Sequence, residues 1–349
     1  MMGVPEFIDI PAAWYGDDMS ADRDLWTYNL TDNDITELEI AAADFNNLSL
    51  PLGLISKENF PLQKFGNFLR QMQNELRKGI GFKLIRGLPV SRYEPKTSST
   101  IFCGIGSHLG SARSQNAAGH LLGHVRDIGA DVNNPNSRIY QTAARQSFHT
   151  DSCEVVGLLC LKEAMKGGDS MLASSVTVYN EIAKRRPDLI LHLFDEVATD
   201  RRGEVPRGQD PFFTIPVFNW FKGYLTCLYQ RNYIDAAQRF KAAPKLKPQQ
   251  KEVLDLLDNI ANEPKIHLKM RLKPGDLQFV YNHSLLHDRT SFNDWPDPSQ
   301  RRHLLRLWLA LPQDRPLPPS FRQRYGHVTI GDRGGVITEE TILHAPFYA

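Results

Sequence analysis

The 349-residue sequence contains little cysteine, no excess of either charge and no long hydrophobic run. Its four cysteines include no C-x-x-C pair, which excludes a zinc knuckle or a dithiol redox motif of that spacing. A chain of this length does not need disulfides to stabilise a core, so we expect all four to be reduced. They are Cys103, Cys153, Cys160 and Cys227.

The charge balance and the hydropathy exclude two kinds of partner. Lysine and arginine total 41 against 40 acidic residues, and no basic run is long enough to bind nucleic acid. No segment approaches the roughly 20 apolar residues that span a bilayer. Residues 1–16 include Glu6 and Asp9 and lack the basic and apolar regions of a secretory signal. We therefore expect a cytoplasmic protein that acts on a small molecule, and its oligomeric state stays open.

Helical patterns dominate the first part of the sequence, and strand patterns dominate the rest. Thr31 is a predicted helix N-cap, and residues 61–78 place apolar side chains on one helical face. Further helices are predicted at 95–109 and 248–261. Strands are predicted at 82–85, 138–142, 267–272, 277–282 and 303–311, a long strand pair at 147–161, and strands joined by a turn at 212–229.

This order of elements predicts a single domain, residues 1–349, of the α+β class. Residues 1–80 form a mainly helical N-terminal part, and residues 82–311 form a β-rich core with inserts. Closely spaced strands with glycine and proline turns predict a barrel or jelly roll with helices packed outside it. Residues 312–349 form a C-terminal tail, which either closes over a pocket as a lid or docks on the outside.

A histidine and an aspartate lie two positions apart in one predicted strand, as His149-Thr150-Asp151. Side chains two apart in a strand point to the same side, so His149 and Asp151 are able to bind one ion together. A second histidine, His287, follows the predicted strand at 277–282. Two histidines and one carboxylate leave coordination positions open on a metal ion, the arrangement typical of non-haem Fe(II) oxygenases.

The predicted strand at 303–311 has one apolar face, which suits packing under helices, and one face that carries two arginines. The second face consists of Arg302, Leu304, Arg306 and Trp308. If this face points into the barrel, its guanidinium groups need a partner, because an unpaired buried charge is costly. A dicarboxylic acid supplies that partner, since arginine binds a carboxylate through two parallel hydrogen bonds.

Four motifs in a fixed order resemble those of the TauD/TfdA-type dioxygenases, within the clavaminate-synthase-like group. They are Phe148-His149-Thr150-Asp151, Gly167-Gly168-Asp169-Ser170, Asn282-His283-x-x-Leu286-His287-x-Arg289 and Arg301-Arg302-His303-Leu304-Leu305-Arg306. Each motif is weak alone, but the ordered set is specific, and the similarity runs from about residue 82 to 311. The resemblance implies a distorted double-stranded β-helix, or jelly roll, that uses Fe(II), 2-oxoglutarate and O₂.

The resemblance also implies a role for individual residues. The implied iron ligands are His149, Asp151 and His287. Arg302 and the hydroxyl of Ser170 would hold the distal carboxylate of 2-oxoglutarate, and Arg306 would approach its other end. The implied reaction oxidises an unactivated C–H bond of a small polar substrate, an amino acid or another carboxylate, with succinate and CO₂ as coproducts. Hydroxylation, desaturation and oxidative cyclisation, such as aziridine formation from valine, stay open, and a role in secondary metabolism fits all three.

Several assignments have alternatives at this stage. His283 precedes His287 by four residues and has the same strand parity, so it is a rival ligand. The 15 residues between His287 and Arg302 also leave Arg301 open as the residue that holds the diacid. Ser170 is equally explained as a turn residue. The candidates for substrate contact are His283, Arg201 and Phe347.

Two other functions compete with the oxygenase. A zinc-dependent, cupin-like hydrolase or isomerase would use the same two histidines and aspartate, but it has no need of inward-facing arginines. A non-catalytic jelly-roll binding protein would need neither the metal ligands nor the arginines.

Overall fold

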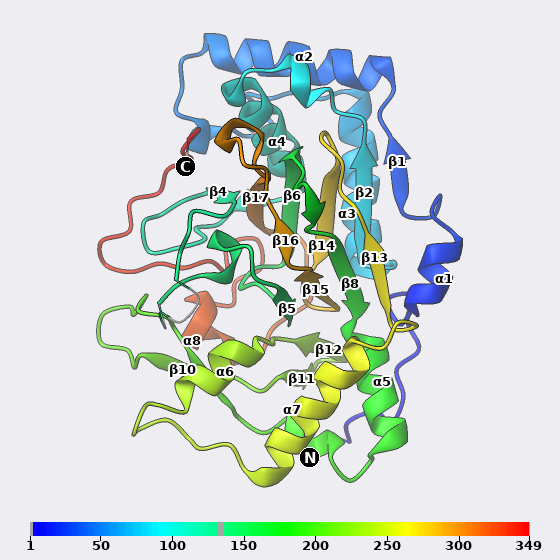
Figure 1. The fold of residues 1–349 in the computed structure, drawn as a ribbon, viewed down its shortest axis with the longest axis vertical. Helices are drawn as coiled ribbons and strands as arrows, with labels where there is room; N and C mark the ends of the chain where they lie inside the picture. Colours follow the sequence, from blue (N-terminus) through cyan, green and yellow to red (C-terminus); the bar gives the residue numbers. More distant parts are fainter. Residues whose placement is uncertain (1–2, 132–133, 135, 349) are drawn as a thin grey trace.

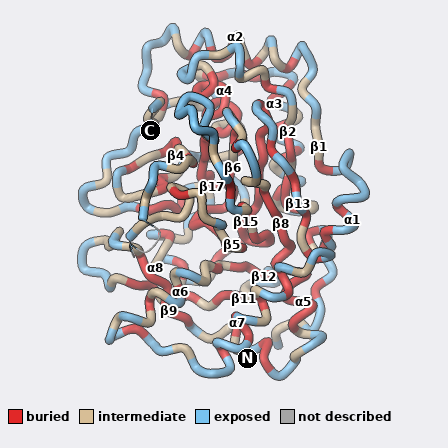
Figure 2. Tube along the Cα trace, in the orientation of Figure 1, coloured by how far each residue is buried: buried red, intermediate tan, exposed pale blue. Residues whose placement is uncertain are grey.

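Two β-sheets packed face to face form the centre of the computed structural model, and helices cover their outer sides (Figure 1). The structure describes residues 3–131, 134 and 136–348. The predicted α+β class is confirmed: the chain folds as a jelly roll with flanking helices, and the two sheets of the described residues do not close into a barrel. Buried residues concentrate along the central strands (Figure 2).

Within the described residues, the larger sheet has seven strands, ordered β1-β2-β14-β6-β17-β3, and β4 pairs with β17. All of its pairings are antiparallel except that of β1 with β2. The strands are β1 (Thr27–Asn29), β2 (Phe82–Arg86), β3 (Ser111–Ala112), β4 (Leu122–Val125), β6 (Val155–Lys162), β14 (Leu277–Tyr281) and β17 (His303–Ala310).

The smaller sheet is antiparallel, in the order β13-β8-β15-β5. Its strands are β5 (Gln146–His149), β8 (Ser170–Ser174), β13 (His267–Met270) and β15 (Leu285–Arg289). In the part of the chain that the structure describes, three two-stranded pairs lie outside the two sheets. They are β7 (Lys166–Gly167) with β16 (Phe292–Asn293), β9 (Ala198–Asp200) with β10 (Phe212–Thr214), and β11 (Phe218–Phe221) with β12 (Tyr224–Cys227).

The helices are α1 (Gly16–Ala21), α2 (Asp32–Asn47), α3 (Lys64–Lys78), α4 (Pro95–Leu109), α5 (Ser175–Arg185), α6 (Arg231–Ala237), α7 (Pro248–Ala261) and α8 (Arg322–Tyr325). Helices α2, α3 and α4 pack against the outer face of the larger sheet, where Leu307 of β17 is buried. Helices α5 and α7 pack beside the smaller sheet, where Leu286 of β15 is buried. Leu172 and Leu304 help to fill the space between the sheets. The two faces of β17 are therefore divided as the sequence predicts.

The strongest local signals of the sequence are confirmed. Thr31 caps α2: its side chain accepts a hydrogen bond from the Asp34 N–H, and the Asp34 carboxylate accepts one from the Thr31 N–H. Helices α4 and α7 have the predicted bounds, and each has proline in its first turn. The boundaries suggested near residues 80 and 312 remain a prediction.

Other local expectations are wrong. The strand predicted at 138–142 is a 3₁₀ helix over Ile139–Gln141, and helix α6 was not expected. The strand that carries His149 ends there, because the Thr150 N–H turns to the carbonyl of Tyr229 at 2.8 Å. His287, expected just beyond a strand, lies inside β15.

An arginine of the C-terminal segment is fully buried and ties that segment to the core. Arg333 donates through Nε to Glu154 and through Nη2 to Asp314 at 3.1 Å. Its Nη2 also donates to the carbonyl of Arg315 at 2.8 Å. Glu154 lies immediately before β6, so the ion pairs join the end of the chain to the larger sheet.

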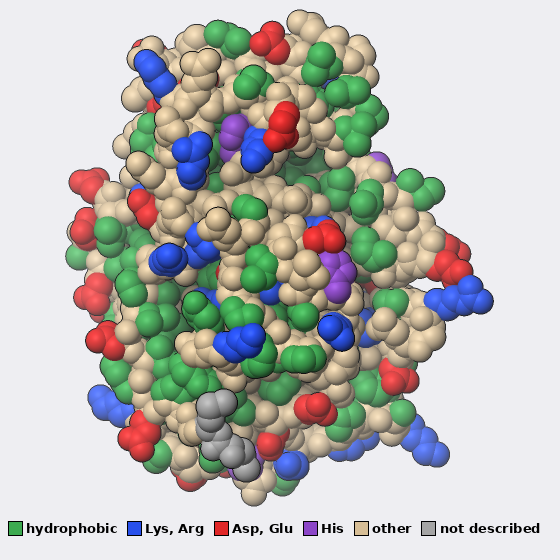
Figure 3. Space-filling model, turned by 180° about the vertical axis from the view of Figure 1, so that it is seen from behind, with side chains coloured by type: hydrophobic (Ala, Val, Ile, Leu, Met, Phe, Trp, Pro, Cys, Tyr) green, Lys and Arg blue, Asp and Glu red, His purple; other side chains and the backbone are tan. Residues whose placement is uncertain are grey.

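Acidic and basic side chains are mixed on the face turned away in Figure 1 (Figure 3). Among the described residues, none of the helices has both the length and the apolar character needed to cross a bilayer.

Replacing Arg333 with methionine removes the buried cation that pairs with Glu154 and Asp314. We expect the free energy of unfolding to fall by about 3 to 5 kcal/mol, because the partners of a broken ion pair remain in a low-dielectric interior. Urea unfolding followed by circular dichroism measures the change. The control is Arg207→Met, because Arg207 forms an exposed pair with Glu339 worth less than about 1 kcal/mol. Equal losses in the two variants would contradict the prediction.

Candidate metal centre

Pairing between β15 and β5 brings two distant histidines together. In this antiparallel register His287 lies directly opposite His149, and their ring centroids are 4.1 Å apart. Asp151 follows β5 and completes the cluster, with its carboxylate oxygens 3.9 Å from Nε2 of His149 and 3.8 Å from Nε2 of His287. One ligand atom from each residue lies within 4.8 Å of the others, a spacing that suits a single metal ion.

Hydrogen bonds of the backbone fix the His149-Thr150-Asp151 segment after the strand ends. The side chain of Asn282 accepts from the Asp151 N–H at 3.2 Å and donates to the carbonyl of Cys153 at 3.1 Å. The Thr150 hydroxyl accepts from the Tyr229 N–H at 2.9 Å. Asn282, the first residue of the third motif, thus holds the carboxylate segment in place.

The carboxylate of Asp151 is buried and surrounded by positive or donating groups. Arg306 lies 3.3 Å from its Oδ2, and the indole N–H of Trp308 donates to the same oxygen at 2.7 Å. Burial raises the pKa of Asp151, but Arg306 and the two histidines of the cluster lower it more, so it lies below its ordinary value. Burial and the adjacent His149 lower the pKa of His287 to about 3. At neutral pH the cluster therefore offers a carboxylate and a neutral His287 imidazole, the forms that bind metals.

Two hydrogen bonds with a glutamine side chain hold Arg306 in place. Its Nε donates to Oε1 of Gln115 at 2.7 Å, and Nε2 of Gln115 donates to the Arg306 carbonyl at 2.8 Å. A Cβ on Gly123 would lie 2.4 Å from the Gln115 oxygen, so a side chain there would displace this support. From the sequence, Arg306 is expected near 2-oxoglutarate, and its contact with Asp151 is not predicted.

One cavity beside the cluster contains the predicted diacid-binding residues, and we call it the Arg302 cavity. Its lining includes Tyr140, Gln146, Ser170, Gln278, Arg289 and Arg302, together with the two histidines and Arg306. The Ser170 hydroxyl donates to Gln278 at 3.0 Å. Arg302 is buried, and its Nη1 has no hydrogen-bond partner among the described residues. Arg301 is exposed and donates to the carbonyl of Trp295, so Arg302 is the arginine of the pair that faces the cavity.

The second glycine of the second motif makes room for this arginine. Gly168 has a φ of +74°, a conformation that side chains rarely adopt. A Cβ on Gly168 would lie 3.0 Å from Nε of Arg302, so glycine allows the close approach.

Positive charge accumulates in the Arg302 cavity. The guanidinium groups of Arg289 and Arg302 lie 4.7 Å and 5.1 Å from the ring centroid of Phe292. Burial lowers the pKa of Arg302 to about 10, and burial with the neighbouring Arg302 lowers the pKa of Arg289 to about 9. The acidic residue that lines the cavity, Asp288, already pairs with Arg145. A dianionic ligand would relieve this accumulation of like charge.

A second cavity adjoins the cluster, and we call it the Arg138 cavity. Its lining includes Arg138, Gln230 and Tyr233, together with His149 and Asp151. Four residues line both cavities: Tyr140, Gln146, His149 and Arg306. The cluster therefore adjoins two cavities that share these four residues.

The three predicted substrate contacts lie elsewhere. His283 is buried beside Asp314, 3.6 Å away, and belongs to a separate cluster with Glu154. Arg201 donates to the carbonyls of Asp210 and Gln323. Phe347 packs against the helical side of the larger sheet. None of the three lines either cavity as the structure describes them, so the end of the tail does not cover the cluster.

Sequence reasoning missed several residues of the site. Gln146 lies 2.8 Å from Nε2 of His149, and the ring of Tyr140 lies 4.6 Å from the guanidinium of Arg306. Arg138 and Tyr140 fall in the segment wrongly predicted as a strand. Gln146 begins β5, but it lies one residue before the strand predicted at 147–161.

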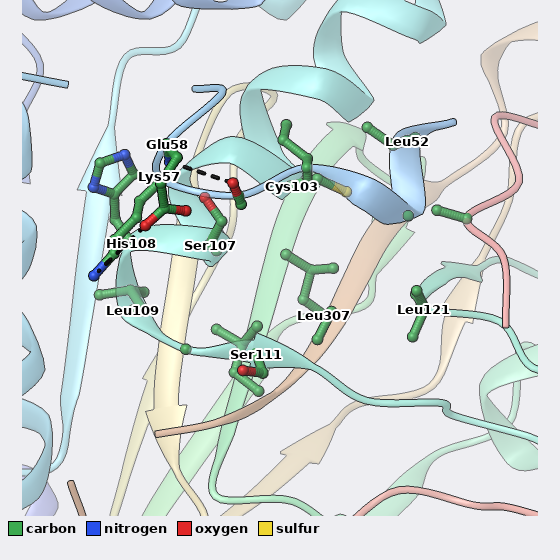
Figure 4. A pocket seen from close by; sticks show the side chains of 18 of the residues that line it. Leu52, Lys57, Glu58, Cys103, Ser107, His108, Leu109, Ser111, Leu121 and Leu307 are labelled. Carbon is green, nitrogen blue, oxygen red and sulfur yellow. Dashed lines mark hydrogen bonds and ion pairs between the residues drawn. The ribbon is translucent and has the colours of Figure 1, made fainter. Parts of the chain in front are cut away.

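A roomier cavity, of about 430 Å³, lies on the other face of β17 (Figure 4). Leu307 lines it, and this side chain points away from the side of the strand that carries Arg306. Lys57, Glu58 and His108 are also in its lining, but the described residues there form no cluster of metal ligands. This cavity is therefore separate from the candidate metal centre.

Comparisons with known proteins agree with this geometry. The family described as "Taurine catabolism dioxygenase TauD, TfdA family" matches residues 47–308. The chain is 33% identical over 308 residues to FR-33289 synthase of Streptomyces rubellomurinus, which covers 86% of this chain and 89% of that protein. It is 34% identical over 305 residues to a taurine hydroxylase-like protein of Stachybotrys chartarum, covering 84% and 77%.

The fold is also that of a solved enzyme of this kind. An asparagine oxygenase in complex with Fe(II), 3-hydroxyasparagine and succinate superposes with a TM-score of 0.64 at 16% identity, covering 81% of this chain and 93% of that one. The fold and cluster define a jelly-roll protein with a candidate mononuclear metal centre. The chain belongs to the TauD/TfdA family of Fe(II)- and 2-oxoglutarate-dependent dioxygenases.

The assignment of the third ligand is tested by exchanging each of the two rival histidines. We expect His287→Gln to weaken the binding of Mn(II) by more than about 100-fold, because it removes a neutral nitrogen ligand. The matched variant His283→Gln should bind Mn(II) as the unaltered protein does, because His283 lies in another cluster. Anaerobic calorimetric titration measures both affinities. Loss of binding in His283→Gln alone would reverse the assignment.

Proposed function

We propose that His149, Asp151 and His287 hold the iron, and that Arg302, assisted by Ser170, holds the distal carboxylate of 2-oxoglutarate. The single observation that carries this proposal is the buried Nη1 of Arg302, which has no hydrogen-bond partner among the described residues, in a side chain that lines a cavity next to the cluster. A buried, unpaired guanidinium costs free energy unless a ligand completes it. The residues present therefore fit both the metal and the diacid.

Iron with 2-oxoglutarate and O₂ would supply the oxidation of an unactivated C–H bond, with succinate and CO₂ as coproducts. The protein's own residues orient the reactants. Arg306 and Trp308 keep Asp151 ionised and fix its orientation. The Arg302 cavity holds the cosubstrate, and the Arg138 cavity on the Asp151 side of the cluster receives the substrate.

The substrate we propose is a small polar molecule, an amino acid or another carboxylate. An asparagine oxygenase with the same fold was solved with a hydroxylated amino acid, which supports this size and polarity. Hydroxylation, desaturation and ring closure, such as aziridine formation from valine, are the outcomes that the same oxidation allows. A zinc hydrolase on this fold would leave the buried Nη1 of Arg302 without the partner that a diacid supplies, which favours the oxygenase.

The proposed activity predicts O₂-dependent formation of succinate. Anaerobic protein loaded with Fe(II) and 2-oxoglutarate should release succinate after O₂ is admitted, faster when an amino acid of a broad panel is the substrate. Mass spectrometry of succinate and of each amino acid measures the reaction. Asp151→Ala should abolish it, because a ligand is lost. Succinate formation that survives in Asp151→Ala, or zinc-dependent activity, would contradict the proposal.

Two adjacent arginines provide a matched test of the diacid site. We expect Arg302→Gln to raise the KM for 2-oxoglutarate by about 10- to 150-fold, because a hydrogen bond to a charged group contributes about 1.5–3 kcal/mol. Arg301→Gln should leave this KM unchanged, because Arg301 is exposed. Steady-state rates at varied 2-oxoglutarate measure both. An equal rise of this KM in the two variants would contradict the assignment of Arg302 as the residue that holds the diacid.

A further inference from the structure

A guanidinium from the C-terminal segment lies beside the metal cluster, on the substrate side. Arg324 belongs to α8, and its Nε donates to the hydroxyl of Ser152 at 2.7 Å. Ser152 follows Asp151 directly in the sequence. Arg324 lines a small cavity together with Thr150 and Ser152, and this cavity shares Gln230 and Tyr233 with the Arg138 cavity. The guanidinium is therefore next to the space assigned to the substrate and does not line the Arg302 cavity.

The position of Arg324 is built into the fold. The Gly335 N–H donates to the carbonyl of Ser152 at 2.8 Å, and the Gly334 N–H donates to the carbonyl of Tyr325 at 3.2 Å. A Cβ on Gly334 would lie 2.9 Å from the Ser152 carbonyl, and its φ is +90°, so glycine is required for this approach. The C-terminal segment is thus held against the residue that contacts Arg324.

Arg324 lacks an acidic partner. None of the described residues forms an ion pair with it, and only its Nε has a hydrogen bond. Burial and the nearby Arg138 lower the pKa of Arg324 to about 10. Arg138 itself pairs with Glu204, so that carboxylate is already used.

Positive charge therefore exceeds negative charge around this space. Arg201 contacts only carbonyl and amide oxygens, and its guanidinium stacks on Phe213 at 5.4 Å. Arg324 stacks on the same ring at 5.6 Å. Asp151 faces the metal cluster and Arg306, and Asp210 lies near Arg201.

We propose that Arg324 binds an anionic group of the substrate, a carboxylate or a phosphate-like group, and so restricts the enzyme to small anions. This inference rests on the proposed function, because it takes the Arg138 cavity as the substrate site. A half-buried guanidinium forms strong, two-pronged hydrogen bonds with such groups. The C-terminal segment then acts through α8, in the middle of the tail, and not through its last residues.

The experiment uses the full chain with Mn(II) at the metal centre and saturating 2-oxoglutarate, without turnover. Inorganic phosphate and acetate are the two probes, observed through the relaxation of their ³¹P and ¹³C nuclei by the paramagnetic ion. We expect at least one probe to show saturable relaxation enhancement. The probe that binds more tightly identifies the anion as phosphate-like or as a carboxylate.

Arg324→Gln should weaken that binding at least tenfold, and Arg324→Lys should weaken it less, because the charge remains. The exposed control Arg207→Gln should bind the probe as the unaltered protein does. Unsaturable relaxation in the unaltered protein, or equal probe affinity in Arg324→Gln, would overturn the inference. Binding of Mn(II) and 2-oxoglutarate is measured first for every protein. Its absence in the unaltered chain would instead refute the proposed function, and its presence in the variants shows that they fold.

Discussion

The cross-strand pairing of His287 with His149 is the contact on which the rest of the site depends. A register shift of one residue would turn either side chain to the other face of the smaller sheet and disperse the cluster. The sandwich enforces the register, because Leu286 and Leu285 bury on opposite faces of β15. Hydrophobic packing thus sets the position of two imidazoles that belong to segments far apart in the chain.

The charged side chains around this contact fall into two groups: those paired within the protein and those that line a cavity. Where the protein needs a fixed charge, it supplies the partner itself, as Arg306 and Trp308 do for Asp151. Where a guanidinium lines a cavity, as those of Arg302 and Arg324 do, none of the described residues supplies an acidic partner. Each incomplete group costs stability in the free protein and favours binding of an anion, so specificity is gained at the expense of stability.

Buried polar contacts attach the C-terminal segment to the core beside the candidate metal centre. Arg333 joins it to Glu154 before β6, and Gly335 joins it to Ser152 after the aspartate. The last residues behave differently: Ile342 and Tyr348 are largely exposed, and Phe347 packs on the helical side. One half of the tail is therefore held against the segment that follows Asp151, and the other half is not.

The sequence alone determined the elements and residue types whose signals are local: the Thr31 cap, the bounds of α4 and α7, and the alternation that turns Arg306 and Leu307 to opposite faces. It also predicted His149, Asp151 and His287 as metal ligands, because few other functions need the four motifs in that order. Only the tertiary structure decided between His283 and His287 as neighbours of Asp151, between Arg301 and Arg302 at the cavity, and the presence of Arg138 and Arg324. Those outcomes depend on strand register and on contacts between segments over 100 residues apart, and no short-range pattern encodes such contacts.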